Sequence, residues 1–106
     1  MWPAYFATPE HVLAFPDLRA SVEVYAGLFA SLTAALPELE AALPRVGVPV
    51  GFVAGAASPM PHDAAAGATA RAIPGAWLDV QDDAGHFPWF ERPGCVRAAL
   101  DRLIAR

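Results

Sequence analysis

The sequence predicts an α/β fold in which N-terminal helices precede a βαβα unit with two parallel strands. Three observations support this prediction. Apolar residues between positions 22 and 36 recur at spacings of three and four, which is typical of an amphipathic helix. Two short apolar runs, 48–55 and 76–81, are bounded by turn residues, as buried strands are. A helical pattern follows each run, and this alternation is typical of parallel sheets.

The N-terminal region is predicted to be helical but interrupted. Three prolines among the first 19 residues prevent a long helix there. A longer helix is expected from about residue 20, with Asp17 or Ser21 as its N-cap. Pro37 is expected to end this helix and to open a short second one that reaches about residue 43.

The second half is predicted to be one βαβα unit with a right-handed crossover. A helix capped by Asp63 is expected between the two strands, and Pro93 is expected to open the final helix. The first run is nearly all apolar, which predicts a strand buried on both faces. A parallel sheet of only two strands has almost no core. We therefore expect the first strand to have another parallel neighbour, and this chain to be part of a larger fold.

Composition and charge bear on the class of partner. The chain has 106 residues, 56% of them hydrophobic, and a formal net charge of -4. Its seven basic residues are scattered arginines, which argues against nucleic acid as a partner. No uninterrupted apolar run approaches the roughly 20 residues of a membrane span. The N-terminus also lacks the features of a signal peptide, so a cytoplasmic protein without a membrane span is expected.

No metal or cofactor is expected. The single cysteine, Cys95, excludes an internal disulfide and is interpreted as a small buried apolar residue. The other histidines, His11 and His62, have no partners at metal-ligand spacing. Asp82 and Asp83 are expected to be solvated.

The segment "DDAGHFPWFERPG" carries the strongest candidate for chemistry. Its histidine, His86, follows the second predicted strand, and ligands bind at the carboxyl ends of strands in open α/β sheets. A histidine titrates near neutral pH, as a general base requires. Gly85 is expected to allow a tight turn, and Phe87 and Trp89 are expected to exclude water and line an acyl pocket. Without this context, His86 would be interpreted as an ordinary surface histidine.

These residues carry a resemblance to a known family. "VPVGFVAGAASPMP", "AWLDVQ" and the Gly-His loop with its Glu-x-Pro resemble the C-terminal part of an α/β-hydrolase. The resemblance implies a partial α/β-hydrolase fold, with residues 1–43 as lid or cap helices and residues 44–106 as the C-terminal part of the core. It also implies that His86 is the general base of an enzyme that hydrolyses esters, amides or similar acyl substrates.

Two parts of the family's machinery are not in their usual form. Ser58 stands where the family often has its catalytic aspartate. Three explanations are open: the acid comes from upstream, Asp63 reaches in, or the machinery is degraded. None of the three serines lies in the G-x-S-x-G turn that holds a nucleophile, which is expected before Met1.

The resemblance therefore predicts a hydrolase fragment that acts on a small-molecule substrate as part of the full-length enzyme and is inactive alone. The partner is expected to be the missing N-terminal half, or a second copy through self-association. Two alternatives remain: a non-catalytic remnant or interaction module, and a dehalogenase or epoxide hydrolase of the same fold.

Overall fold

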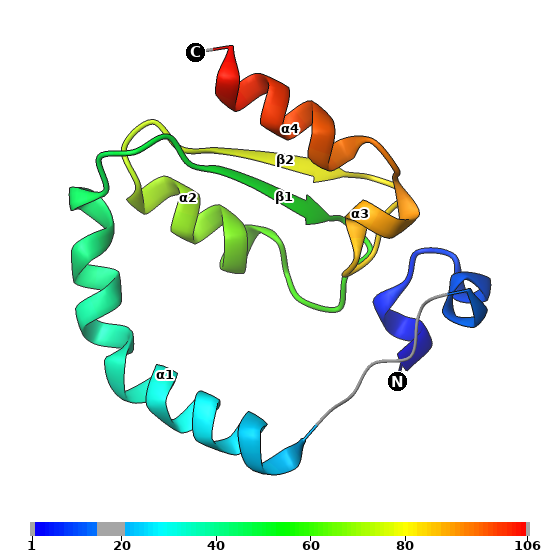
Figure 1. Cartoon of the computed structure of the whole chain (residues 1–106), viewed down its shortest axis with the longest axis horizontal. Helices are drawn as coiled ribbons and strands as arrows, with labels where there is room; N and C mark the ends of the chain where they lie inside the picture. The colour runs from blue at the N-terminus through cyan, green and yellow to red at the C-terminus, as the bar shows by residue number, and fades with distance from the viewer. Residues whose placement is uncertain (1, 15–20, 106) are drawn as a thin grey trace.

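A computed structural model of the chain describes residues 2–14 and 21–105, and it is an α/β structure (Figure 1). Two 3₁₀ helices begin the chain, as expected for an interrupted N-terminal segment. The elements follow in the order η1 (Trp2–Tyr5), η2 (Pro9–Leu13), α1 (Val22–Ala42), η3 (Leu43–Arg45), β1 (Gly51–Gly55), η4 (Asp63–Gly67), α2 (Ala68–Ala72), β2 (Trp77–Gln81), α3 (Pro88–Glu91) and α4 (Cys95–Ile104).

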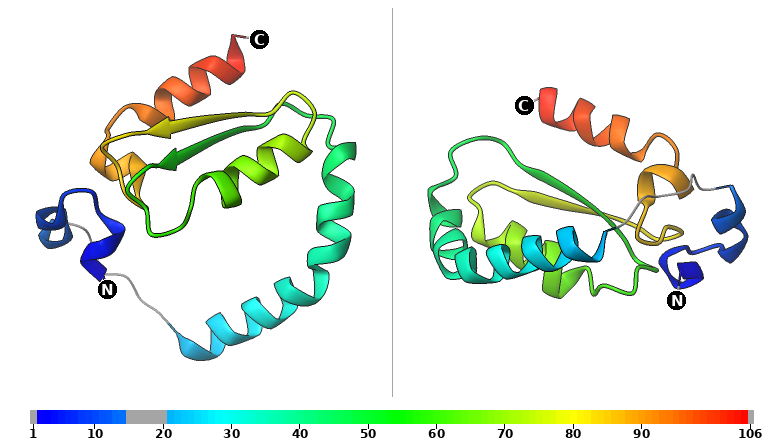
Figure 2. Two further views of the ribbon diagram at one scale, coloured as in Figure 1. Left: turned by 180° about the vertical axis from the view of Figure 1, so that it is seen from behind. Right: turned by 60° about the horizontal axis from the view of Figure 1, so that its bottom comes forward.

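The two strands form a parallel sheet, which confirms the prediction. Gly51 pairs with Trp77 at one end and Gly55 pairs with Gln81 at the other. The helix between the strands, α2, lies on one side of the sheet and α4 lies on the other (Figures 1 and 2). Because the two strands are parallel, their carboxyl ends lie at the same end of the sheet. The loops after β1 and β2 therefore leave the sheet side by side.

The prediction that Pro37 ends the first long helix is wrong. Pro37 lies inside α1, which is continuous over 21 residues. Proline removes one hydrogen bond and crowds the carbonyl of Thr33, and α1 bends near this point (Figure 1). The N-cap is Ser21, whose Oγ accepts a hydrogen bond from the Val24 N–H at 3.3 Å. The other proposed cap, Asp17, lies outside the described residues.

Three further boundaries differ from expectation. The first strand begins only at Gly51, beyond Pro49, and residues 51–54 are half-buried rather than buried on both faces. Asp63 does not cap the next helix, because it lies inside the π-helical turn η4 and pairs with Arg71. The predicted loop after β2 contains the short helix α3, and α4 begins after Gly94, whose φ of 97° suits glycine.

The final helix, α4, packs against β1. Its residues Val96 and Leu100 are exposed. Cys95 is buried, as expected for a small apolar residue. The Arg102 guanidinium lies 4.1 Å from the centroid of the Trp77 ring and covers its face.

The long helix α1 has no buried residue. Tyr25 is 67% exposed, Phe29 is 57% exposed and Leu32 is 49% exposed, although these residues form the predicted apolar face. The helix extends away from the sheet as an arm (Figures 1 and 2). With the turn after it, Val22–Arg45 is long and apolar enough to cross a membrane. That is weak evidence, because signal sequences and the mostly buried core helices of soluble proteins meet the same criterion; in this helix the apolar window is 0% buried.

The core is small for a chain of this length. Among the described residues, no large side chain is fully buried. The chain exposes 7578 Å², whereas a compact monomer of this mass is expected to expose about 5,700 Å². Its radius of gyration is 15.5 Å, against about 13 Å for a compact domain of this length. The chain therefore leaves uncovered much apolar surface that a self-sufficient domain would bury.

We expect the isolated chain to self-associate or to unfold without a sharp transition, because its apolar surface is not covered. Sedimentation velocity over a range of concentrations, together with thermal unfolding followed by circular dichroism, checks this. A monomer with a single cooperative melt would show that the small core is sufficient.

Candidate functional site

The loops after the two strands bring His86 and Ser58 together. Ser58 Oγ lies 3.1 Å from His86 Nδ1, although 28 residues separate the two. The hydroxyl oxygen also accepts a hydrogen bond from the Met60 N–H at 3.1 Å, which fixes its position. The serine therefore holds one ring nitrogen of the histidine and leaves the other, Nε2, without a described protein partner.

The N-terminal segment holds the histidine from a second direction. The backbone N–H of His86 donates a hydrogen bond to the Tyr5 carbonyl at 2.6 Å. The Tyr5 ring lies against the imidazole, with centroids 5.1 Å apart. Phe6, which is buried, packs on Phe87 at a centroid distance of 5.3 Å. The first helical turn of the chain thus packs directly on the histidine loop.

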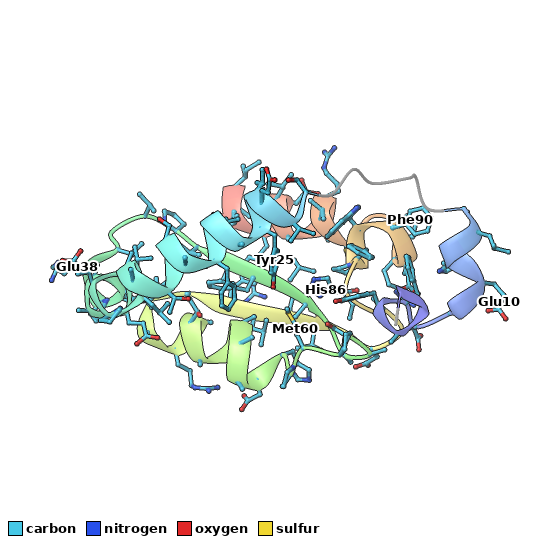
Figure 3. All side chains as sticks on the ribbon, turned by 90° about the horizontal axis from the view of Figure 1, so that it is seen from below. Glu10, Tyr25, Glu38, Met60, His86 and Phe90 are labelled. Atoms are coloured by element: carbon cyan, nitrogen blue, oxygen red, sulfur yellow. The ribbon has the colours of Figure 1, made fainter. Side chains whose placement is uncertain are left out.

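A pocket of about 250 Å³ opens beside His86. Figure 3 shows His86 and Met60, two of its lining residues, near the end of β1. Its walls are mostly apolar and come from β1, the loop after it, η4, the loop that carries His86, α3 and α4. No residue of β2 contributes. Its polar side chains are Ser58, His62 and His86. The Nδ1 atom of His62 is buried and has no described hydrogen-bond partner.

Glu91 ties the N-terminal segment to the histidine loop. Its side chain has no exposed surface. The carboxylate accepts hydrogen bonds from the N–H groups of Ala7 at 2.9 Å, Thr8 at 3.0 Å and Gly85 at 3.1 Å. His11 Nδ1 lies 3.2 Å from its Oε2.

Those contacts also decide the charge of Glu91. Burial acts to raise the pKa of the Glu91 carboxyl, because it disfavours the charged form. The backbone N–H groups of Thr8, Ala7 and Gly85, together with His11, outweigh burial and leave that pKa below its ordinary value of 4.5. Glu91 is therefore an anion at neutral pH.

Two glycines allow the loops to approach this closely. A Cβ on Gly85 would overlap the Tyr5 carbonyl oxygen, and one on Gly55 would overlap the Gly85 carbonyl oxygen. Gly85 was expected to permit a tight turn, but positive φ angles in the described chain occur only at Gly75 and Gly94. The requirement at Gly85 is therefore close contact between backbones, not a left-handed conformation.

The other candidate residues are placed as follows. Trp89 lines the pocket, whereas Phe87 packs on the N-terminal aromatic residues. Asp63 is exposed and pairs with Arg71 at 2.9 Å, so it does not orient His86. Asp82 and Asp83 are exposed, as expected.

Sequence reasoning missed the roles of Tyr5 and Glu91. The signal for Glu91 was a lone acidic residue between Phe90 and Arg92, in an apolar stretch, where an unpaired charge is costly. The dense aromatic residues before position 7 were a second signal, because exposed irregular segments seldom carry so many.

Comparisons with protein-family models, curated proteins and solved structures found no match to this chain.

We expect the contact between the N-terminal segment and the histidine loop to weaken in acid. The lowered pKa of Glu91 means that its ionised form stabilises the fold above pH 4.5, and that this stabilisation is lost as the pH falls through the folded-state value. Hydrogen exchange of the Ala7 and Thr8 amides, corrected for intrinsic rates between pH 3 and 7, checks this. The same pH dependence in Glu91→Gln would contradict the assignment.

We expect Gly85→Ala to release the N-terminal segment, because the added methyl group overlaps the Tyr5 carbonyl. Overpacking of this kind costs about 1–3 kcal/mol, so chymotryptic cleavage after Tyr5 or Phe6 should become about tenfold faster. Gly47→Ala is the matched control, because a Cβ at Gly47 meets nothing within 4 Å. Equal cleavage rates in the two variants would argue against the close contact.

Proposed function

We propose that this chain is the C-terminal part of a serine-type α/β-hydrolase and supplies its general base, His86. The observation that carries the proposal is the contact of 3.1 Å between Ser58 Oγ and His86 Nδ1 at the ends of two adjacent parallel strands. The sequence resemblance places the family's base and its orienting residue at these two positions. The substrate class is an ester, an amide or a similar acyl compound.

The contact suits a base that needs a fixed tautomer. With its proton on Nδ1, the imidazole donates to Ser58 Oγ, and Nε2 is free to accept a proton from a nucleophile. Unlike an aspartate, the serine brings no negative charge and stabilises the imidazolium less. His86 would take the proton of a serine hydroxyl as it attacks the acyl carbon, and later return it to the leaving group.

The open edge of β1 offers a place for the rest of such an enzyme. The Val50 carbonyl and the Ala56 N–H bond to β2, at 3.4 and 3.0 Å. Along a strand, the backbone groups of alternate residues face opposite edges, so Gly51, Val53 and Gly55 face away from β2. No described strand pairs with that edge. The pocket borders β1 without touching β2, so a further parallel strand there would bring its carboxyl-terminal loop to His86.

In this proposal, residues 1–43 are the lid region and residues 44–106 are core. The exposed apolar face of α1 suits a helix that covers the substrate and the missing core. The nucleophile and the oxyanion-stabilising groups belong to the missing part, and a small-molecule substrate binds between the two. An aspartate nucleophile, as in dehalogenases and epoxide hydrolases of this fold, is compatible with the same base.

A second candidate is a non-catalytic interaction module. Its support is the exposed face of Tyr25, Phe29 and Leu32, together with the neutral residue at position 58. Such a module would use α1 to bind another protein. The reading frame before Met1 separates the two candidates: a G-x-S-x-G motif roughly 100 or more residues before β1 favours the enzyme, whereas an in-frame stop just before Met1 favours the module.

We expect the isolated chain to hydrolyse a nitrophenyl ester no faster than its His86→Ala variant, because the nucleophile is missing. His62→Ala is the matched control, since it removes the other imidazole that lines the pocket. Clear turnover that depends on His86 would show that the chain is catalytic by itself.

If the upstream frame encodes the motif, the joined protein provides the positive test. An alkyl fluorophosphonate should label the serine of that motif, and His86→Ala should slow labelling by about 10²–10⁴-fold, the usual contribution of a general base. Labelling that is indifferent to His86 would overturn the proposal.

A further inference from the structure

We propose that Glu91 is a positioning residue for His86: its carboxylate locks the backbone of residues 5–8 onto the loop that carries the imidazole. The inference concerns the position of the ring and rests on the proposed function only for its use in catalysis.

The two oxygens of the carboxylate have different hydrogen-bond partners. Oε1 accepts from Ala7 N–H and Gly85 N–H, so one atom bridges the N-terminal segment and the histidine loop. Oε2 accepts from Thr8 N–H and contacts His11. Hydrogen bonds to a charged acceptor are roughly twice as strong as neutral ones, and this acceptor is shielded from water.

These bonds flank the contact that fixes His86. Gly85 directly precedes the histidine, and Ala7 lies two residues after Tyr5. Between them, the His86 N–H donates to the Tyr5 carbonyl. The carboxylate therefore closes a small cycle of backbone contacts, and the imidazole projects from it between the Tyr5 ring and Ser58. Loss of the carboxylate would release the Tyr5 carbonyl from the His86 N–H. Among the hydrogen bonds described for His86, the contact with Ser58 would then remain.

Among the described residues, His11 is the one basic side chain that contacts this carboxylate. From η2 it faces His11, and from its own helix region its neighbour Arg92 turns outward to pair with Asp83 at 3.3 Å. Among the described residues, no arginine forms an ion pair with Glu91. A neutral glutamine at this position can offer only one acceptor oxygen, and its NH₂ group would oppose an N–H donor.

The test uses the full chain and hydrogen–deuterium exchange read by mass spectrometry. Two signals are followed: the amides of peptides covering 5–8 and 84–87, and the ring C2 hydrogen of His86, with His62 as the internal reference. In Glu91→Gln, the amides should exchange about tenfold faster, the expected effect of losing a charge-assisted hydrogen bond, and the ring C2 hydrogen of His86 should exchange faster because the ring becomes more accessible to solvent. Amides of β1 and β2 should keep their rates.

Two variants control the experiment. Glu10→Gln makes the same chemical change at an exposed glutamate in the adjacent 3₁₀ helix, and it should leave every rate unchanged. His11→Ala removes one partner but leaves the three backbone hydrogen bonds, so it should have a smaller effect than Glu91→Gln. Unchanged His86 ring exchange in Glu91→Gln would overturn the proposal. Equal acceleration across β1 and β2 would also overturn it, because Glu91 would then support the whole fold and not the histidine loop.

Discussion

The parallel pairing of β1 with β2 is the constraint on which the rest of the structure depends. It places the carboxyl ends of both strands at the same end of the sheet, so that loops from distant parts of the sequence meet there. Ser58 and His86 come into contact because of that pairing, and the N-terminal segment then packs over the second loop through Glu91. In an antiparallel arrangement, these two loops would lie at opposite ends of the sheet.

The same pairing also explains the unusual amount of exposed surface. Parallel strands are stable when they are covered on both faces and paired on both sides, and here one helix covers each face of a sheet with only two strands. Among the described residues, no strand pairs with the edge of β1 that faces away from β2, and no residue of α1 is buried.

Much of this fold could be predicted from the sequence because its signals are local. The strand runs, the helix after each and the loop position of His86 follow from apolar periodicity and turn residues. The predictions that failed relied on the commonest local role of a residue. Proline usually ends a helix, but Pro37 is accommodated by a bend in an exposed helix where there is room for it. Asp63 resembled a cap, but Arg71, eight residues further on, provides an ion-pair partner.

The candidate site was predictable only in part. The loop position of His86 was expected from its context, whereas the Glu91 contacts join residues 80 or more positions apart, except for Gly85, and no local pattern predicts them.

The near-contact of Gly55 with Gly85, and of Gly85 with Tyr5, has a consequence for protein engineering. The three backbones are stacked with no room for a side chain between them, so the loops after β1 and β2 cannot be exchanged separately. A graft that moves the histidine loop to another scaffold must carry the N-terminal turn and the end of β1 with it. The transferable unit is therefore this three-segment stack, which is discontinuous in the sequence.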